Sequence, residues 1–130
     1  MNREKIIDIA DRFYYFYASA LSRDQGVRIL MYHLITKAAG PEKKDPMMVS
    51  RNRFQEQLGL IKNSGYQVIS LKDAITILEQ GQLNAKYLVL TFDDFFPETI
   101  ENVLPLLSQY QFPACFFVGI GSLVLETKKE

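Results

Sequence analysis

The fold of this chain follows from one stretch, Tyr87-Leu88-Val89-Leu90-Thr91-Phe92-Asp93-Asp94. Its first six residues are largely apolar and β-prone, which is typical of a strand buried on both faces in a parallel sheet. The run stops at two adjacent carboxylates, Asp93 and Asp94. Ligands of parallel α/β folds bind at the carboxyl ends of the strands, so a functional site is expected here. Because side chains alternate along a strand, the two carboxylates should point in different directions and can take different roles.

The composition limits the number of domains, the kinds of partner and the cysteine chemistry that this chain can have. The chain has 130 residues, enough for one modest domain with one core. Its 15 basic and 15 acidic residues give a formal net charge of zero, so nothing indicates a nucleic acid or an anionic membrane as partner. The single cysteine, Cys115, excludes an internal disulfide framework and is expected to be an inert core residue. The single histidine is His33.

Residues 1–24 are predicted to form an N-terminal helical extension, because apolar residues recur at helical spacing over residues 3–22. Charged residues interrupt this segment, so it predicts no transmembrane span, and its aromatic cluster is unlike a signal peptide. We expect a helix packed on the domain, with an interfacial or partner-binding helix as the alternative. As written, the chain is expected to be cytoplasmic; export is left open if it is part of a longer protein.

Strands and helices are predicted to alternate through the rest of the chain. The first expected elements are a strand over 27–32, a surface loop over 36–49, a helix from Ser50 to Gly65 and a strand over 67–70. A helix from Ser70 to about Gly81 follows and is expected to bury Leu71, Ala74, Ile75 and Leu78. After the central strand come a helix from about Pro97, with Ile100, Val103, Leu104 and Leu107 on the sheet and a kink or break at Pro105, and a buried strand over 114–118. This order predicts an α/β fold with a mostly parallel sheet. It amounts to roughly half of an eight-fold barrel, so the chain is either truncated or a small open sheet.

Three stretches together resemble the N-terminal half of a polysaccharide deacetylase domain (NodB homology, carbohydrate esterase family 4). They are Leu30-Met31-Tyr32-His33; Phe54 with Gln57-Leu58 through Gly65-Tyr66 and Val68-Ile69-Ser70-Leu71; and Leu90-Thr91-Phe92-Asp93-Asp94 followed by Leu104-Pro105-Leu106-Leu107, Phe112-Pro113-Ala114 and Phe116-Phe117-Val118. The similarity runs from about Val27 to Ser122. Residues 25–130 are therefore expected to form the N-terminal part of such a domain.

The resemblance implies a partial, distorted (β/α) barrel and a hydrolase that removes N-acetyl, sometimes O-acetyl, groups from polysaccharides. It also implies a divalent metal, commonly Zn²⁺. By the family pattern, Asp93 is the general base and Asp94 is a metal ligand. The chemistry suits these residue types, since a carboxylate can take a proton from an attacking water and an ionised carboxylate binds hard cations.

The chain departs from the family pattern at two points. Glycine follows the aspartate pair in the family, whereas Phe95 follows it here; a phenylalanine restricts the turn and is expected to fill part of the groove. The two metal-binding histidines of the second family motif are also absent, while a catalytic zinc site normally takes three protein ligands. We therefore expect the metal site of this chain to be incomplete and its own deacetylase activity to be weak or absent.

His33 is expected at the same rim as Asp93 and Asp94, because all three follow strands of a parallel sheet. It could contact substrate or orient a carboxylate. The family does not use this position as a metal ligand, and lone histidines usually have structural roles. A structural hydrogen-bonding role is therefore favoured for His33.

Other functional classes fit the sequence less well. A noncatalytic carbohydrate-binding or scaffold module would also explain the missing histidines, but it would not need the aspartate pair. A nucleotide hydrolase would require a phosphate loop, which the sequence lacks, and a phosphoacceptor domain would place acidic residues after the first strand. The expected partner is a polysaccharide or oligosaccharide, and an uncovered sheet edge predicts self-association.

Overall fold

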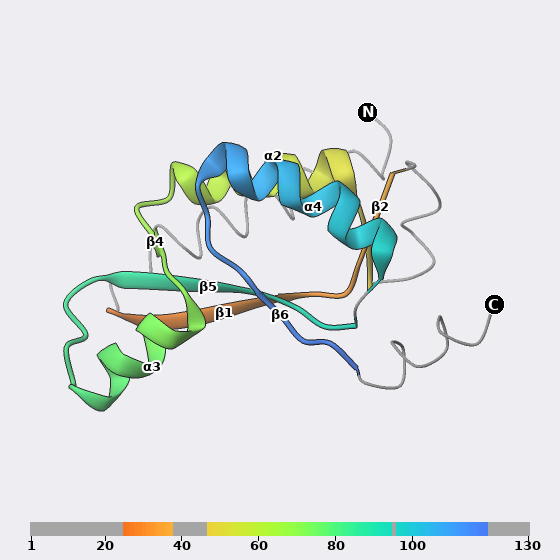
Figure 1. Cartoon of the computed structure of the whole chain (residues 1–130). Coiled ribbons are helices and arrows are strands. Elements are labelled where there is room, and N and C mark those ends of the chain that lie inside the picture. Colours follow the sequence, from red (N-terminus) through yellow and green to blue (C-terminus); the bar gives the residue numbers. More distant parts are fainter. Residues whose placement is uncertain (1–24, 38–46, 95, 120–130) are drawn as a thin grey trace.

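A computed structural model describes residues 25–37, 47–94 and 96–119. The described part is a mixed α/β structure with parallel strands, as the sequence predicts (Figure 1). Its elements are β1 (Gly26–Tyr32), β2 (Leu34–Thr36), β3 (Met48–Ser50), α2 (Arg51–Lys62), β4 (Gln67–Val68), α3 (Leu71–Glu79), β5 (Lys86–Phe92), α4 (Pro97–Tyr110) and β6 (Cys115–Phe116). The predicted helix over 3–22, and the extension that contains it, lie outside the described residues.

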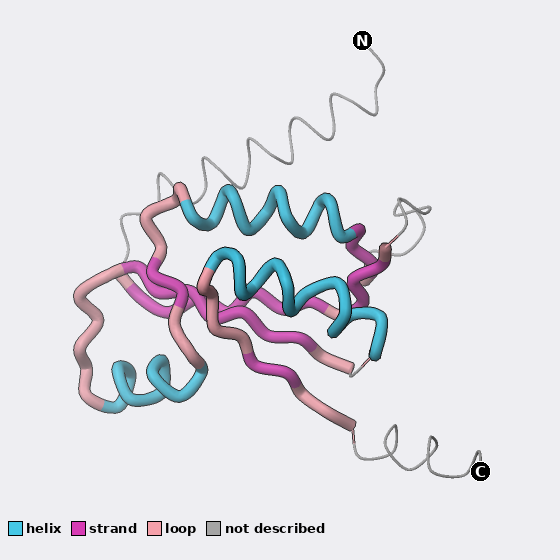
Figure 2. Tube along the Cα trace, turned by 45° about the horizontal axis from the view of Figure 1, so that its top comes forward, coloured by secondary structure: helices cyan, strands magenta, loops and turns pink. Residues whose placement is uncertain are grey.

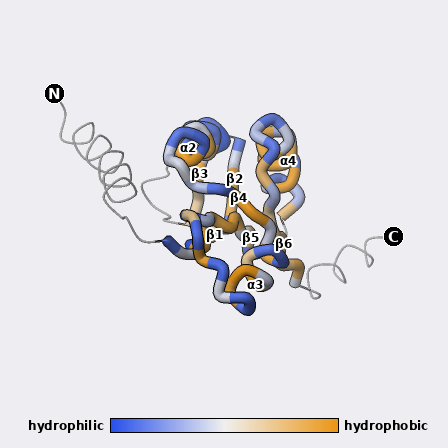
Figure 3. Tube along the Cα trace, turned by 90° about the vertical axis from the view of Figure 1, so that its left-hand side faces the viewer, coloured by the Kyte–Doolittle hydropathy of each residue, from blue (hydrophilic) through white to orange (hydrophobic). Residues whose placement is uncertain are grey.

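Strand β5 is the centre of the main sheet. β1 pairs with it in parallel along its whole length, from Gly26 opposite Lys86 to Tyr32 opposite Phe92. β4 pairs beside the beginning of β5 and β6 beside its end, so both lie on the side away from β1. The chain therefore moves from β1 past β5 to β4 and then turns back. When such connections are right-handed, reversing direction places the next helix on the opposite face. Accordingly α2 and α4 cover one face and α3 the other (Figure 3).

The core lies between the sheet and the layer formed by α2 and α4 (Figure 2). Every residue of β5 from Tyr87 to Phe92 is buried, as predicted for a central strand. The Phe92 ring stacks on Tyr32 and on Phe116, and Phe54 of α2 meets it edge-on. These contacts join three neighbouring strands to α2.

The predicted surface loop over 36–49 is wrong in part. β2 and β3 pair in parallel to form a second, two-stranded sheet, with Leu34 opposite Met48 and Thr36 opposite Ser50. Residues 38–46 between them lie outside the described part. Each strand has three residues, too few for an alternating pattern to separate a strand from a loop.

The helices begin where the sequence predicts. Ser50 and Ser70 cap α2 and α3: each hydroxyl accepts a hydrogen bond from a backbone N–H in the first turn. The prediction for the buried face of α3 is wrong in part: Ala74 is buried as predicted, whereas Ile75 and Leu78 are 49% and 53% exposed. Apolar residues occur on two faces of this short helix, so the sequence pattern alone does not select one.

Helix α4 differs from the prediction at Leu104, and it is not broken at Pro105. Leu104 is 49% exposed and does not face the sheet. Pro105 does not end the helix, which continues to Tyr110. Pro105 and Glu101 are both exposed, so water can reach the Glu101 carbonyl that loses its helical partner.

The last strand is also shorter and less buried than predicted. β6 spans Cys115–Phe116, and both of its residues are half-buried. Phe117 and Val118 are exposed. The described residues form no closed barrel, and none of their helices has the length and apolar character to cross a membrane.

Side chains of α4 bind the edge of β2 that faces away from β3. The hydroxyl of Thr99 accepts a hydrogen bond from the Ile35 N–H at 3.1 Å, and the Asn102 amide donates to the Ile35 carbonyl at 3.0 Å. Thr99 and Asn102 are 1% and 2% exposed. They satisfy the backbone groups of Ile35 that would otherwise be buried without partners. Two polar residues of α4 thus take the place of a neighbouring strand.

We predict that Thr99→Val lowers the free energy of unfolding by about 1–3 kcal/mol, because the Ile35 N–H loses its partner in a buried place. Urea denaturation followed by circular dichroism measures this change. The matched control is Thr76→Val on the exposed face of α3, where the same substitution should change stability by at most about 0.5 kcal/mol. Equal effects of the two substitutions would contradict the role of Thr99.

Candidate active site at the end of β5

The aspartate pair lies at the carboxyl end of the central strand. The Asp93 N–H donates to the Tyr32 carbonyl at 2.8 Å and so extends the pairing of β1 and β5 by one residue. Asp93 is half-buried, whereas the Asp94 side chain is 69% exposed. Asp94 has a φ of 60°, a left-handed conformation that aspartate tolerates better than most residues. The chain therefore leaves the strand direction directly after Asp93.

An open pocket of about 460 Å³ lies over the pair, lined by Asp93, Asp94, Phe117, Val118 and Gly119. The last three residues reach the site because the Phe117 N–H donates to the Phe92 carbonyl at 2.9 Å. The sequence predicted no site role for Phe117, Val118 or Gly119. Their position directly after a parallel strand was the signal that could have placed them here.

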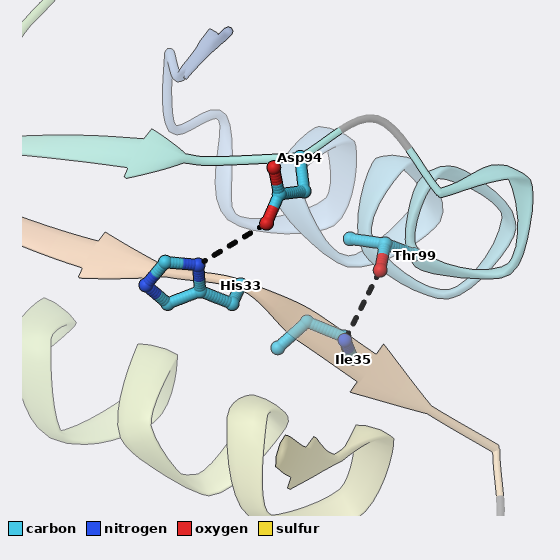
Figure 4. A network of polar contacts seen from close by, with 4 residues as sticks. All are labelled: His33, Ile35, Asp94 and Thr99. Atoms are coloured by element: carbon cyan, nitrogen blue, oxygen red, sulfur yellow. Dashed lines mark hydrogen bonds and ion pairs between the residues drawn. The ribbon is translucent and has the colours of Figure 1, made fainter. Parts of the chain in front are cut away.

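His33 meets Asp94 at the same rim. It lies between β1 and β2, and its Nδ1 atom is 3.7 Å from Asp94 Oδ2 (Figure 4). The imidazole is 23% exposed, yet Nδ1 itself has neither solvent contact nor a hydrogen-bond partner. The structure thus brings His33, Asp93 and Asp94 to one edge of the sheet. Phe95 lies outside the described residues, and Cys115 is half-buried in β6.

A complete metal site does not fit the described residues. Within them, no three histidine, cysteine or acidic side chains lie close enough to hold one ion. Asp94 offers an exposed carboxylate, a suitable hard ligand, and His33 Nδ1 is the orphaned polar atom next to it. A catalytic zinc normally takes a third protein ligand, which this part of the chain does not supply.

Comparisons with known proteins agree on one family. The polysaccharide deacetylase family model matches residues 80–130. The putative polysaccharide deacetylase YxkH of Bacillus subtilis is 28% identical over 91 residues, which are 69% of this chain and 30% of that protein. The poly-beta-1,6-N-acetyl-D-glucosamine N-deacetylase of Staphylococcus aureus is 27% identical over 73 residues, or 56% of this chain and 25% of that protein.

A solved structure shows the same fold. The Streptococcus pyogenes deacetylase PplD in complex with acetate superposes with a TM-score of 0.66 at 30% identity, covering 79% of this chain and 46% of that chain. This chain thus spans less than a third of the curated relatives named above and about half of the solved one. The chain is therefore similar, in sequence and in fold, to part of the catalytic domain of polysaccharide deacetylases.

Proposed function

We propose that this chain contributes to an enzyme that hydrolyses N-acetyl groups on the amino sugars of a polysaccharide. The observation that carries the proposal is the carboxylate pair at the end of β5, which lines an open pocket. The deacetylase relatives support the same reaction class. The uncharged overall balance of the chain suits a neutral sugar better than a nucleic acid.

Asp93 is proposed as the general base. Its backbone is fixed by the hydrogen bond to Tyr32, and its side chain lines the pocket, where a water molecule can reach it. As the water attacks the acetamide carbonyl, the carboxylate accepts the proton of that water. The carbonyl carbon then loses the nitrogen, and the products are acetate and a free amino sugar. The leaving amine takes up a proton, which water in the open pocket can supply.

Asp94 is proposed to contribute one ligand to a divalent cation, with Zn²⁺ as the expected ion. When bound, such a cation would supply a positive charge that favours attack on the acetamide carbonyl. The described residues do not complete this site, so the remaining ligands would have to come from elsewhere. Phe95 is proposed to line the substrate groove. The exposed Phe117 ring, on the rim of the pocket, offers an apolar surface for a sugar ring.

A noncatalytic carbohydrate-binding module is the second candidate. The observation that favours it is the incomplete set of metal ligands among the described residues. Such a module would bind an oligosaccharide at the same pocket without releasing acetate.

Cytoplasmic localisation stays a prediction.

Self-association also stays a prediction. It is supported by β1, whose Ile29 and Met31 side chains are 61% and 55% exposed. Among the described strands of the main sheet, β1 lies at an edge. Exposed apolar side chains on an edge strand favour association with another chain.

The reaction is tested by acetate release from an N-acetylglucosamine oligosaccharide in the presence of Zn²⁺. We expect at most slow release by the 130-residue chain, because the described residues do not supply a complete set of metal ligands. Asp93→Asn should lower whatever release occurs by about 10²–10⁴-fold, since the base is lost. Rapid release by the chain alone would contradict the incomplete site, and release that Asp93→Asn leaves unchanged would contradict the base.

Zn²⁺ titration calorimetry separates the two candidate functions. A deacetylase site should bind Zn²⁺ weakly, and Asp94→Asn should weaken the binding by about tenfold or more, because a ligand is lost. The matched control is Glu56→Gln, which removes an exposed carboxylate of α2 and should leave the affinity unchanged. Binding that Asp94→Asn does not alter would favour the noncatalytic module.

A further inference from the structure

The His33 side chain carries an unexplained feature. A polar atom buried without a hydrogen bond is unfavourable and is rare in folded proteins. Its Nδ1 is such an atom, and Asp94 Oδ2 lies 3.7 Å from it. That separation is too long for a hydrogen bond, although the two groups face each other (Figure 4).

The backbone on both sides of His33 is held in place. Tyr32, before it, accepts the hydrogen bond from the Asp93 N–H. Ile35, two residues after it, is bound by Thr99 and Asn102 of α4. His33 therefore has little freedom to move toward a partner of its own.

Asp94 has the freedom that His33 lacks. Its side chain is 69% exposed, so rotation about its side-chain bonds meets little packing. A rotation that shortens the 3.7 Å separation between Oδ2 and Nδ1 would give the buried nitrogen a hydrogen-bond partner.

We propose that His33 is a positioning residue, whose Nδ1–H donates to Asp94 Oδ2 and fixes the orientation of that carboxylate. Carboxylates that hold metals are commonly oriented by such hydrogen bonds. The bond would keep the carboxylate turned toward β1 and hold it in one orientation. The role of the oriented carboxylate rests on the proposed function, whereas the hydrogen bond does not.

The proposal specifies one tautomer of the imidazole. In a neutral ring, one nitrogen carries the proton and the other has a free lone pair. A proton on Nδ1 makes His33 a donor to Asp94. A proton on Nε2 would instead leave the Nδ1 lone pair facing the carboxylate, as in a metal ligand, and would exclude the hydrogen bond.

Nitrogen-15 NMR of the 130-residue chain at alkaline pH, without metal or sugar, tests the tautomer. We expect the proton on Nδ1 and a change of the Nδ1 resonance in Asp94→Asn. The matched control, Glu56→Gln, should leave that resonance unchanged. A proton on Nε2, or an Nδ1 resonance that Asp94→Asn does not alter, would overturn the proposal.

Two substitutions of His33 test the positioning itself. The amide nitrogen of asparagine lies near the place of Nδ1, whereas that of glutamine reaches the place of Nε2. Scalar couplings of Asp94 should therefore show a single side-chain rotamer in the native chain and in His33→Asn, and rotamer averaging in His33→Gln. The same averaging in His33→Asn, or a single rotamer in His33→Gln, would contradict the proposal.

Thermal unfolding of each variant shows whether it folds. If a His33 variant does not fold, the Asp94→Asn experiment still tests the hydrogen bond. Neither NMR measurement uses metal or substrate, so the hydrogen bond and the deacetylase activity can fail independently.

Discussion

The double burial of β5 is the constraint on which the rest of the structure depends. Every side chain from Tyr87 to Phe92 is buried, and the strand has neighbours on both sides. A strand in this position cannot accept a charge, because burying an unpaired carboxylate is costly. The first charged residue after it, Asp93, therefore marks the point where the chain leaves the core. The two helical layers follow from the same strand, since α2 and α4 cover one of its faces and α3 the other.

The candidate site is a consequence of parallel pairing. Parallel strands end at the same edge of a sheet, so the residues that follow β1, β5 and β6 come together although they are far apart in the sequence. His33, Asp94 and Phe117 reach the site in this way. The hydrogen bonds from Asp93 to Tyr32 and from Phe117 to Phe92 fix the three strand ends relative to one another. The carboxylate pair is thus held by the sheet, while the left-handed conformation of Asp94 turns its side chain out of the strand.

The sequence predicts those features that a strong local signal controls. The unbroken apolar run of β5 and the serine cap at Ser70 are such signals, and the structure contains both. The pairing of β2 with β3 could not be predicted, because three-residue strands carry no period and depend on Thr99 and Asn102 of a distant helix. The buried face of α3 was also undetermined, since its apolar residues lie on two faces and the sheet selects one of them. The same limit applies to the site: the sequence places Asp93 and Asp94 at a strand end, but the contact between His33 and Asp94 depends on tertiary structure.

The most direct test is hydrogen exchange of the Asp93 amide in the native chain, because the carboxylate proposed as the general base is expected to be fixed by the sheet. The Asp93 N–H donates the hydrogen bond to the Tyr32 carbonyl that ends the pairing of β5 with β1. We predict that it exchanges as slowly as the amides of buried β5 residues, through the same opening that unfolds the sheet. Exchange as fast as that of exposed loop amides would show that Asp93 is free of β1, and would contradict the account.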